Sequence, residues 1–100
     1  MSKKIVVVCD NTQCAKVLEE TSKNLDINIK CEVQQGTKIT NEVSINEIKE
    51  STAVLFAING TVEEIEKIER FIDFEYYEVE PRFILEDAKN VLMEILSDIN

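Results

Sequence analysis

The chain has 100 residues, of which 44% are hydrophobic and 31% charged, with two Gly and one Pro. This length predicts one domain over residues 1–100, and no apolar run approaches the roughly 20 residues that cross a bilayer. The formal net charge of −9 disfavours nucleic acid and anionic membranes as partners, because each normally requires a basic patch.

The N-terminal apolar run, residues 5–8, is too short for the apolar region of a signal peptide. We therefore expect a cytoplasmic protein without direct membrane insertion. The chain has three Cys and no His. An odd number of Cys in that compartment argues against a disulfide framework. The lack of His excludes His-based metal sites and Cys-His catalysis, and we expect neither a metal ion nor a cofactor.

Residues 4–9 form a continuous, mainly β-branched run, which is typical of a central strand covered on both faces. The polar segment 10–13 follows and contains Asp, Asn and Thr, each of which can cap a helix. A helical pattern then continues to about residue 25, with Ala15 and Leu18 facing inward.

Apolar and polar residues alternate over 27–34, which predicts a strand with one more polar face at the edge of the sheet. Residues 37–43 are expected to form a loop. Residues 44–47 have the spacing of a capping box and predict a short helix that ends near residue 50.

Residues 53–58 form a second continuous apolar run and predict a second buried strand. A further capping-box pattern occupies residues 61–64. Ile65, Ile68 and Ile72 then recur at helical spacing, so this segment is expected to be a helix.

Residues 76–80 predict a short strand that ends at Pro81, and a last helix is expected over 85–99. Strands that alternate with helices predict a three-layer α/β/α fold with a four-stranded parallel sheet, in the order 2-1-3-4. Such sheets bind ligands beyond the carboxyl ends of the strands, where the strand order reverses. This rule places the expected site in segments 9–16 and 58–64.

Cys9 ends the first strand directly before a helix N-terminus, where unpaired N–H groups and partial positive charge attract anions. The same environment lowers a thiol pKa. A Cys at the position of Cys9 can therefore accept a phosphoryl group, and Cys14 in the first helical turn could serve the same loop from its other end. The expected cradle for the phosphoryl oxygens consists of the backbone amides of Asp10, Asn11, Thr12, Gln13, Cys14 and Ala15.

A structural role is the alternative for these cysteines, because free Cys is often a small core residue. Cys31, on the apolar side of its strand, is expected in the core. Asp10 also counts against an activated Cys9, since a neighbouring negative charge raises a thiol pKa. The loop lacks Gly, the residue that usually lets a backbone approach phosphate closely.

Several short motifs occur in a fixed order along most of the chain. They are residues 25–32 (LDINIKCE), Gln35-Gly36, residues 39–44 (ITNEVS), residues 47–57 (EIKESTAVLFA) and Arg70-Phe71. This ordered set resembles the IIB component of the fructose type of the bacterial sugar phosphotransferase system. That family shows V-E-T-Q-G, E-N-x-L-T-x-x-D-I, A-D-x-V-I-x-A and R-F in the same order.

The resemblance implies phosphoryl transfer. A IIA component phosphorylates a loop Cys of IIB, and IIB passes the group to a sugar bound by the membrane component IIC. The family loop reads approximately C-P-T-G-x-A-H-T, whereas residues 9–16 of this chain read CDNTQCAK, without Pro, Gly or His. Strict register from Ile5 places Asn11 at the nucleophile position. Other IIB classes have their Cys directly after the first strand, so the resemblance favours Cys9 as the phosphoryl acceptor and Cys14 as the second choice.

Two hypotheses therefore stay open. In the first, the chain is a IIB-like phosphocarrier that uses Cys9 or Cys14. In the second, it is a non-catalytic IIB-like module that has kept a protein partner.

Overall fold

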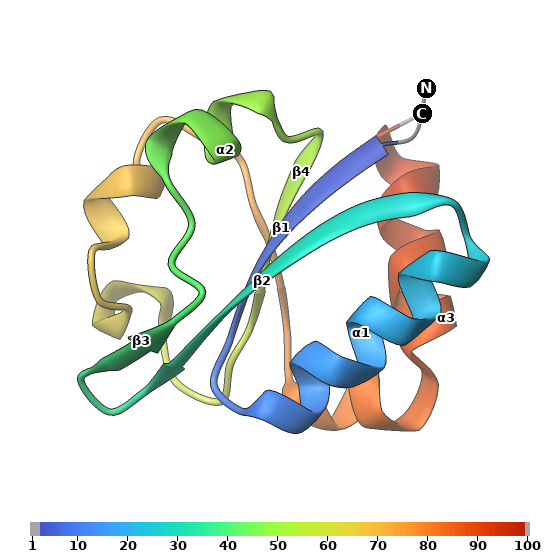
Figure 1. Ribbon diagram of the computed structural model, residues 1–100, viewed down its shortest axis with the longest axis horizontal. Coiled ribbons are helices and arrows are strands. Elements are labelled where there is room, and N and C mark those ends of the chain that lie inside the picture. Colours follow the sequence, from blue (N-terminus) through green and yellow to red (C-terminus); the bar gives the residue numbers. More distant parts are fainter. Residues whose placement is uncertain (1–2, 100) are drawn as a thin grey trace.

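The computed structural model describes residues 3–99 (Figure 1). Along the chain the elements are β1 (Lys3–Cys9), α1 (Thr12–Asn24), β2 (Ile27–Gln35), β3 (Lys38–Thr40), α2 (Ile45–Glu50), β4 (Ala53–Ala57), the 3₁₀ turns η1 (Val62–Glu64) and η2 (Ile68–Phe71), β5 (Tyr77–Val79) and α3 (Pro81–Ile99). Among the described residues, no helix is both long enough and apolar enough to span a bilayer.

The strands form one five-stranded sheet in the order β3-β2-β1-β4-β5. Strands β2, β1, β4 and β5 run parallel to one another, and β3 is antiparallel to β2. The expected α/β class is confirmed. The expectation of a four-stranded, wholly parallel sheet was wrong, and the order differs from 2-1-3-4 by the additional strand β3.

Strand β3 forms because the chain reverses tightly after β2. Gly36, with φ of 65°, adopts the left-handed conformation that Gly tolerates best. Lys38 then pairs with Gln35 and Thr40 with Val33. Strand β2 is therefore not the edge strand that its alternating pattern predicted, since β3 lies outside it.

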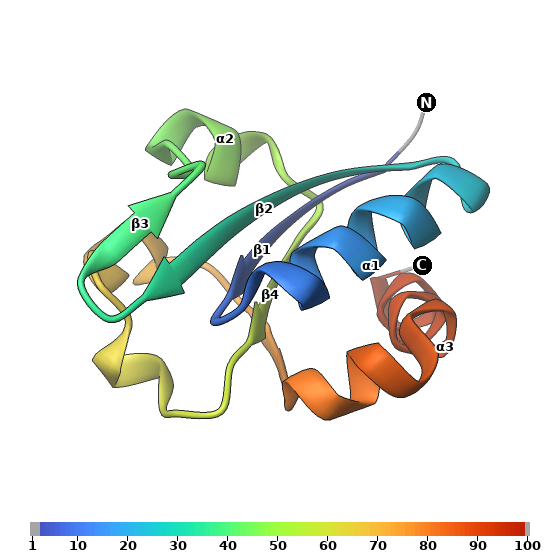
Figure 2. The same cartoon turned by 60° about the horizontal axis from the view of Figure 1, so that its bottom comes forward.

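Strand β1 divides the core into two parts. Ile5, Val7 and Cys9 pack with α1 and α3 on one face of the sheet, whereas Val6 and Val8 pack with α2 and the η1–η2 segment on the other. All five side chains are fully buried, as the sequence predicted for a strand covered on both faces. Figures 1 and 2 show these helical layers on opposite sides of the sheet.

The segment between β4 and β5 is not the helix that its Ile spacing predicted. It forms only the short turns η1 and η2, and Thr61 makes no side-chain cap. Lys67 has φ of 58°, which interrupts any helical run, and Ile72 is 76% exposed. Tertiary contacts hold the segment instead. Gln34 Oε1 accepts from the Glu66 amide at 2.9 Å, and Gln34 Nε2 donates to the Glu66 carbonyl at 3.1 Å.

Glu32 lies fully buried beneath this segment. Its two carboxylate oxygens accept hydrogen bonds from Arg70 Nη1 and Nη2 at 2.7 and 2.9 Å. They also accept from the Val43 amide and from Gln34. Burial alone would raise the pKa of Glu32, but these hydrogen bonds hold it below its ordinary value. The alternation in β2 placed Glu32 on a polar face. That face of the sheet packs against α2 and the η1–η2 segment. Arg70 makes the burial of a carboxylate there possible.

The helix ends follow local capping chemistry. The predicted capping box of α2 is confirmed, with Ser44 and Glu47 bonded reciprocally. Helix α3 begins at Pro81, earlier than the expected start at residue 85. It also breaks at Asp87, which has φ of −160° and ψ of 75°. The Asp87 carboxylate accepts from the Asn90 amide at 3.1 Å and so caps the second part of α3.

Candidate functional site

The expected site lies at the carboxyl edge of the sheet, where β1 and β4 end side by side. Cys9, the last residue of β1, is in register with Ala57, the last residue of β4. Only Asp10 and Asn11 separate β1 from α1. Figure 1 shows both strands ending next to the beginning of α1. The topology thus brings the two predicted loop segments together.

Cys9 has no exposed surface and belongs to the core beneath α1 and α3. Hydrogen bonding with the Cys31 thiol, burial, and the nearby Cys31, Cys14 and Asp10 all raise the pKa of Cys9 far above its ordinary value. In this conformation Cys9 is a neutral thiol without access to solvent. The position at the strand end is as expected, but the side chain points into the core rather than toward the helix N-terminus.

Cys14 is also fully buried, in the first turn of α1. Its Sγ donates to the carbonyl oxygen of Pro81 at 3.5 Å. Burial raises the pKa of Cys14, with a further contribution from Asp10, although hydrogen bonding to Asn11 opposes this rise. Cys31 is 3% exposed, which confirms its expected place in the core.

Asp10 joins the ends of β1 and β4. Its amide donates to the Ala57 carbonyl at 3.3 Å. Its Oδ2 accepts from the Asn59 amide at 2.8 Å and from Asn59 Nδ2 at 3.2 Å. Its Oδ1 accepts from Asn11 Nδ2 at 3.1 Å. The carboxylate is therefore held in place by both neighbouring segments, through Asn11 and Asn59.

Asn11 is the residue that caps α1, among the three polar candidates that the sequence offered. Its Oδ1 accepts from the Cys14 amide at 2.8 Å, and its backbone is extended, with φ of −152°. Two amides of the expected phosphoryl cradle, those of Asp10 and Cys14, are thus already bonded within the protein. Helix geometry leaves the amides of Asn11, Thr12 and Gln13 without intrahelical acceptors.

Two clefts flank this loop. One, of about 400 Å³, lies between the start of α1 and the β2–β3 hairpin and is lined by Thr12, Gln13, Ala15, Lys16, Glu19, Val33, Thr40 and Asn41. The other, of about 130 Å³, lies toward η1, and its polar lining includes Asp10, Gln34 and Glu64. An anion on the η1 side would therefore meet two carboxylates without a lining Lys or Arg.

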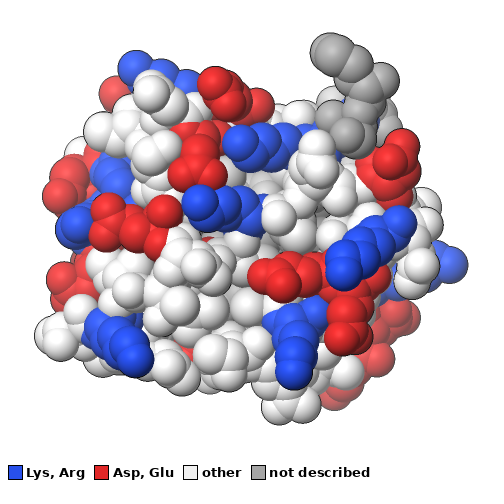
Figure 3. All heavy atoms as spheres, viewed as in Figure 1, with Lys and Arg blue, Asp and Glu red and all other residues white. Residues whose placement is uncertain are grey.

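The charged surface around β2 and α1 is mixed. Figure 3 shows Lys and Arg interspersed with Asp and Glu on this face, without one continuous basic patch. Across the described residues 3–99, no three His, Cys, Asp or Glu side chains are arranged to hold a metal ion. In this conformation the edge offers hydrogen-bonding groups and shallow clefts for a partner, with its sulfur atoms covered.

Asn59 and Pro81 hold Asp10 and Cys14 in place. Asn59 lies within the predicted segment 58–64 but was not singled out there, and Pro81 lies outside both predicted segments. Asn59 had a signal, because it follows a predicted buried strand whose carboxyl end meets that of β1. The Pro81 carbonyl had none, since its contact with Cys14 spans 67 residues of sequence.

The resemblance found in the motifs is confirmed by comparison with known proteins. A protein of Shigella flexneri named PTS system fructose-like EIIB component 1 is 28% identical over 102 residues, covering 95% of this chain and 92% of that protein. No protein-family model matches the chain.

Solved structures agree in fold. The solution structure of the Enzyme IIB subunit of the PTS system from Escherichia coli K12 has a TM-score of 0.86 at 26% identity, covering 99% of this chain and 95% of that one. A crystallised domain of the fructose-specific IIABC component from Borrelia burgdorferi has a TM-score of 0.81 at 25% identity, covering 94% and 93%.

Proposed function

We propose that this chain, a IIB-like domain of the fructose type, works in the cytoplasm as a partner-binding component of a sugar phosphotransferase system. The partners would be a IIA component and a membrane-embedded IIC component, and they would dock on the carboxyl edge of the sheet. In this proposal neither Cys9 nor Cys14 carries a phosphoryl group. The observation that supports it most directly is that both sulfur atoms are fully buried.

The chemistry of phosphoryl transfer explains why burial matters. A thiolate, rather than a thiol, is the nucleophile, and it must approach the phosphorus atom in line with the leaving group. Burial and the surrounding groups raise the pKa of Cys9 and of Cys14. An incoming phosphoryl group would also meet the Asp10 carboxylate, which is held in place by Asn59. Each of these features opposes transfer to either sulfur.

The carboxyl edge nevertheless suits a protein partner. Its loops expose polar groups on rigid supports, which is where binding residues commonly lie in α/β folds. The flanking clefts are lined by Thr12, Gln13 and Asn41 on one side and by Gln34 and Thr61 on the other. These side chains and the unpaired amides of α1 can donate and accept hydrogen bonds.

Phosphoryl transfer through Cys9 is the second candidate function. Its position favours this role, since Cys9 ends β1 two residues before α1 and close to helix amides that lack intrahelical acceptors. Transfer would require the contacts of Asp10 with Asn59 to open, so that the Cys9 sulfur turns out of the core. The amides of residues 10–15 would then form the phosphoryl cradle, and Cys14 is the alternative acceptor.

Incubation with a radiolabelled, phosphorylated IIA component of a fructose-type system separates the two functions. The binding proposal expects IIA to bind, measured by calorimetry, without label appearing on this chain. The matched variants are Cys9→Ala, Cys14→Ala and Cys31→Ala, each checked for folding by circular dichroism. Label that is lost only in Cys9→Ala would establish the carrier function. Absence of binding to both IIA and IIC would overturn the partner-binding proposal.

A further inference from the structure

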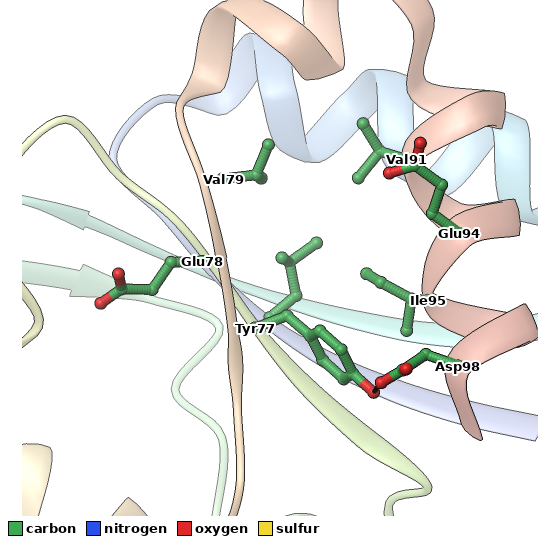
Figure 4. A pocket seen from close by; sticks show the side chains of 8 residues that line it. Tyr77, Glu78, Val79, Val91, Glu94, Ile95 and Asp98 are labelled. Atoms are coloured by element: carbon green, nitrogen blue, oxygen red, sulfur yellow. Dashed lines mark hydrogen bonds between the residues drawn. The ribbon is translucent and has the colours of Figure 1, made fainter.

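An apolar groove lies between β5 and the second part of α3, on the α1/α3 side of the sheet. It has a volume of about 360 Å³ and is lined by Leu55, Tyr77, Glu78, Val79, Val91, Glu94, Ile95 and Asp98 (Figure 4). The groove is separate from the β1–α1 loop and shares no residue with the cradle proposed above.

The groove exists because β5 is short and lies at the edge of the sheet. Helix α3 packs against α1 and β4 through its buried stripe, which includes Leu92 and Ile95. Tyr77 and Val79 of β5 therefore stay only half-buried, and so does Val91 of α3. Leu55 and Ile95, both buried, form the floor. The result is apolar surface that the chain itself leaves partly uncovered.

Two carboxylates of α3 line the groove beside this apolar surface. Glu94 and Asp98 are exposed and lie four residues apart, on one face of α3. Tyr77 Oη donates to Asp98 Oδ2 at 2.5 Å, and this contact fixes the Asp98 carboxylate at the end of the groove (Figure 4). The Glu78 side chain points to the other side of β5 in the same view. None of the described residues that line the groove is Lys or Arg.

These features specify the chemistry of an occupant. Apolar walls favour an aliphatic or aromatic side chain, and the two carboxylates favour a cation beside it. A second copy of this chain would bring the same acidic rim, with a net charge of −9 on each molecule. Anionic lipid and nucleic acid would be repelled for the same reason.

We propose that the β5–α3 groove binds a cationic, amphipathic segment of a partner protein. One or two apolar side chains of the segment lie on Leu55 and Ile95, and a Lys or Arg side chain contacts Glu94 and Asp98. Since the groove lies on a helix-covered face and the Asp10 loop on the carboxyl edge, both surfaces can be occupied together. This inference does not rest on the function proposed above.

A short peptide tests the groove directly. The isotope-labelled protein is titrated with acetyl-Lys-Leu-Lys-Leu-Lys-amide and followed by amide NMR shifts. The expected shifts concentrate at Val79, Val91 and Ile95, and binding weakens with added salt. The paired substitution Glu94→Gln with Asp98→Asn should weaken binding roughly three- to tenfold, because each exposed ion pair contributes modestly. The amide of Asp98→Asn can still accept from Tyr77, so the groove keeps its shape.

Two controls separate the groove from general attraction of a basic peptide to an acidic protein. The paired substitution Glu20→Gln with Glu86→Gln removes the same charge elsewhere and should change affinity by less than about twofold. The peptide acetyl-Lys-Ser-Lys-Ser-Lys-amide has the same charge without apolar side chains and should bind more weakly. Equal effects of the two paired variants, equal binding of the two peptides, or shifts spread over all acidic surfaces would each overturn the proposal.

Discussion

Asp10, at the end of β1, accepts two hydrogen bonds from Asn59, which follows β4. This contact joins the two loops that follow the central strands β1 and β4. It also holds a carboxylate next to Cys9 in the chain, and this charge adds to the rise in the Cys9 pKa. The structural consequence is a sealed loop in a fold whose relatives are named as IIB components.

Substitution Asp10→Ala should open this loop and expose the Cys9 thiol. The substitution removes three side-chain hydrogen bonds, two from Asn59 and one from Asn11. Since each contributes about 1 kcal/mol, their loss lowers the cost of opening and should raise the rate of Cys9 alkylation at least about tenfold. Iodoacetamide labelling, resolved by mass spectrometry of the Cys9 peptide, measures the rate. The exposed Asp73→Ala variant is the control and should react like the unmodified protein. An unchanged rate in Asp10→Ala would show that Asp10 does not hold the loop closed.

Substitution Asn11→Ala should destabilise the protein by about 1 kcal/mol, because it removes the side-chain cap of α1. The Cys14 amide then loses its acceptor at 2.8 Å. Asn11→Ser, whose hydroxyl can still cap the helix, should recover most of the loss. Urea unfolding measures both variants. Equal destabilisation by Ala and Ser would contradict a capping role.

Substitution Arg70→Met should destabilise the protein by about 3–5 kcal/mol, because Glu32 would then be a buried charge without its cation. Arg70 is largely covered, and its guanidinium contacts both oxygens of Glu32. Arg82→Met is the matched control, since Arg82 pairs with Glu80 at the surface, and should cost less than about 1 kcal/mol. The double variant Glu32→Gln with Arg70→Met should be more stable than Arg70→Met alone. Urea unfolding of the three variants at pH 7 tests this order, and the reverse order would contradict it.

The capping box of α2 should make the free energy of unfolding depend on pH in the acidic range. The Ser44 amide, followed by Lys30, lowers the pKa of Glu47 to about 2, against about 4.3 for an unfolded Glu. A lowered folded-state pKa stabilises the protein above the unfolded value, and this stability is lost as the pH falls toward 2. Glu47→Gln should therefore reduce the dependence of the unfolding free energy on pH between about 4 and 2. Glu20→Gln serves as the surface control, and equal slopes for Glu47→Gln and the unmodified protein would contradict the prediction.

Local patterns predicted the parts of the fold that depend on neighbouring residues. The continuous apolar runs identified β1 and β4, and the 44–47 spacing identified the start of α2, because capping involves residues only three apart. The segment 58–75 could not be predicted in this way. Its conformation depends on Arg70 reaching Glu32, 38 residues earlier in the chain.

The candidate site was likewise predictable only where it depends on neighbouring residues in the sequence. The sequence placed Cys9 and the first turn of α1 at the carboxyl edge, and the structure brings them there together with residues 58–61. The direction of the Cys9 side chain was the missing element. Alternation along β1 puts Ile5, Val7 and Cys9 on one face, and that face is the core beneath α1 and α3. The position of the strand end was therefore predictable, whereas the covering of its sulfur by residues of α1 and α3 required the tertiary structure.

The burial of Cys9 and the protonation of its thiol are tested most directly by alkylation of the unmodified protein across pH. Iodoacetamide labelling of the Cys9 peptide is followed between pH 6 and about 9, a range that contains the ordinary thiol pKa of about 8.5. At every pH, labelling of the folded protein should be far slower than labelling of the urea-unfolded chain. Rapid labelling at neutral pH, with a Cys9 pKa below the ordinary value, would contradict the sealed loop and establish an activated sulfur instead.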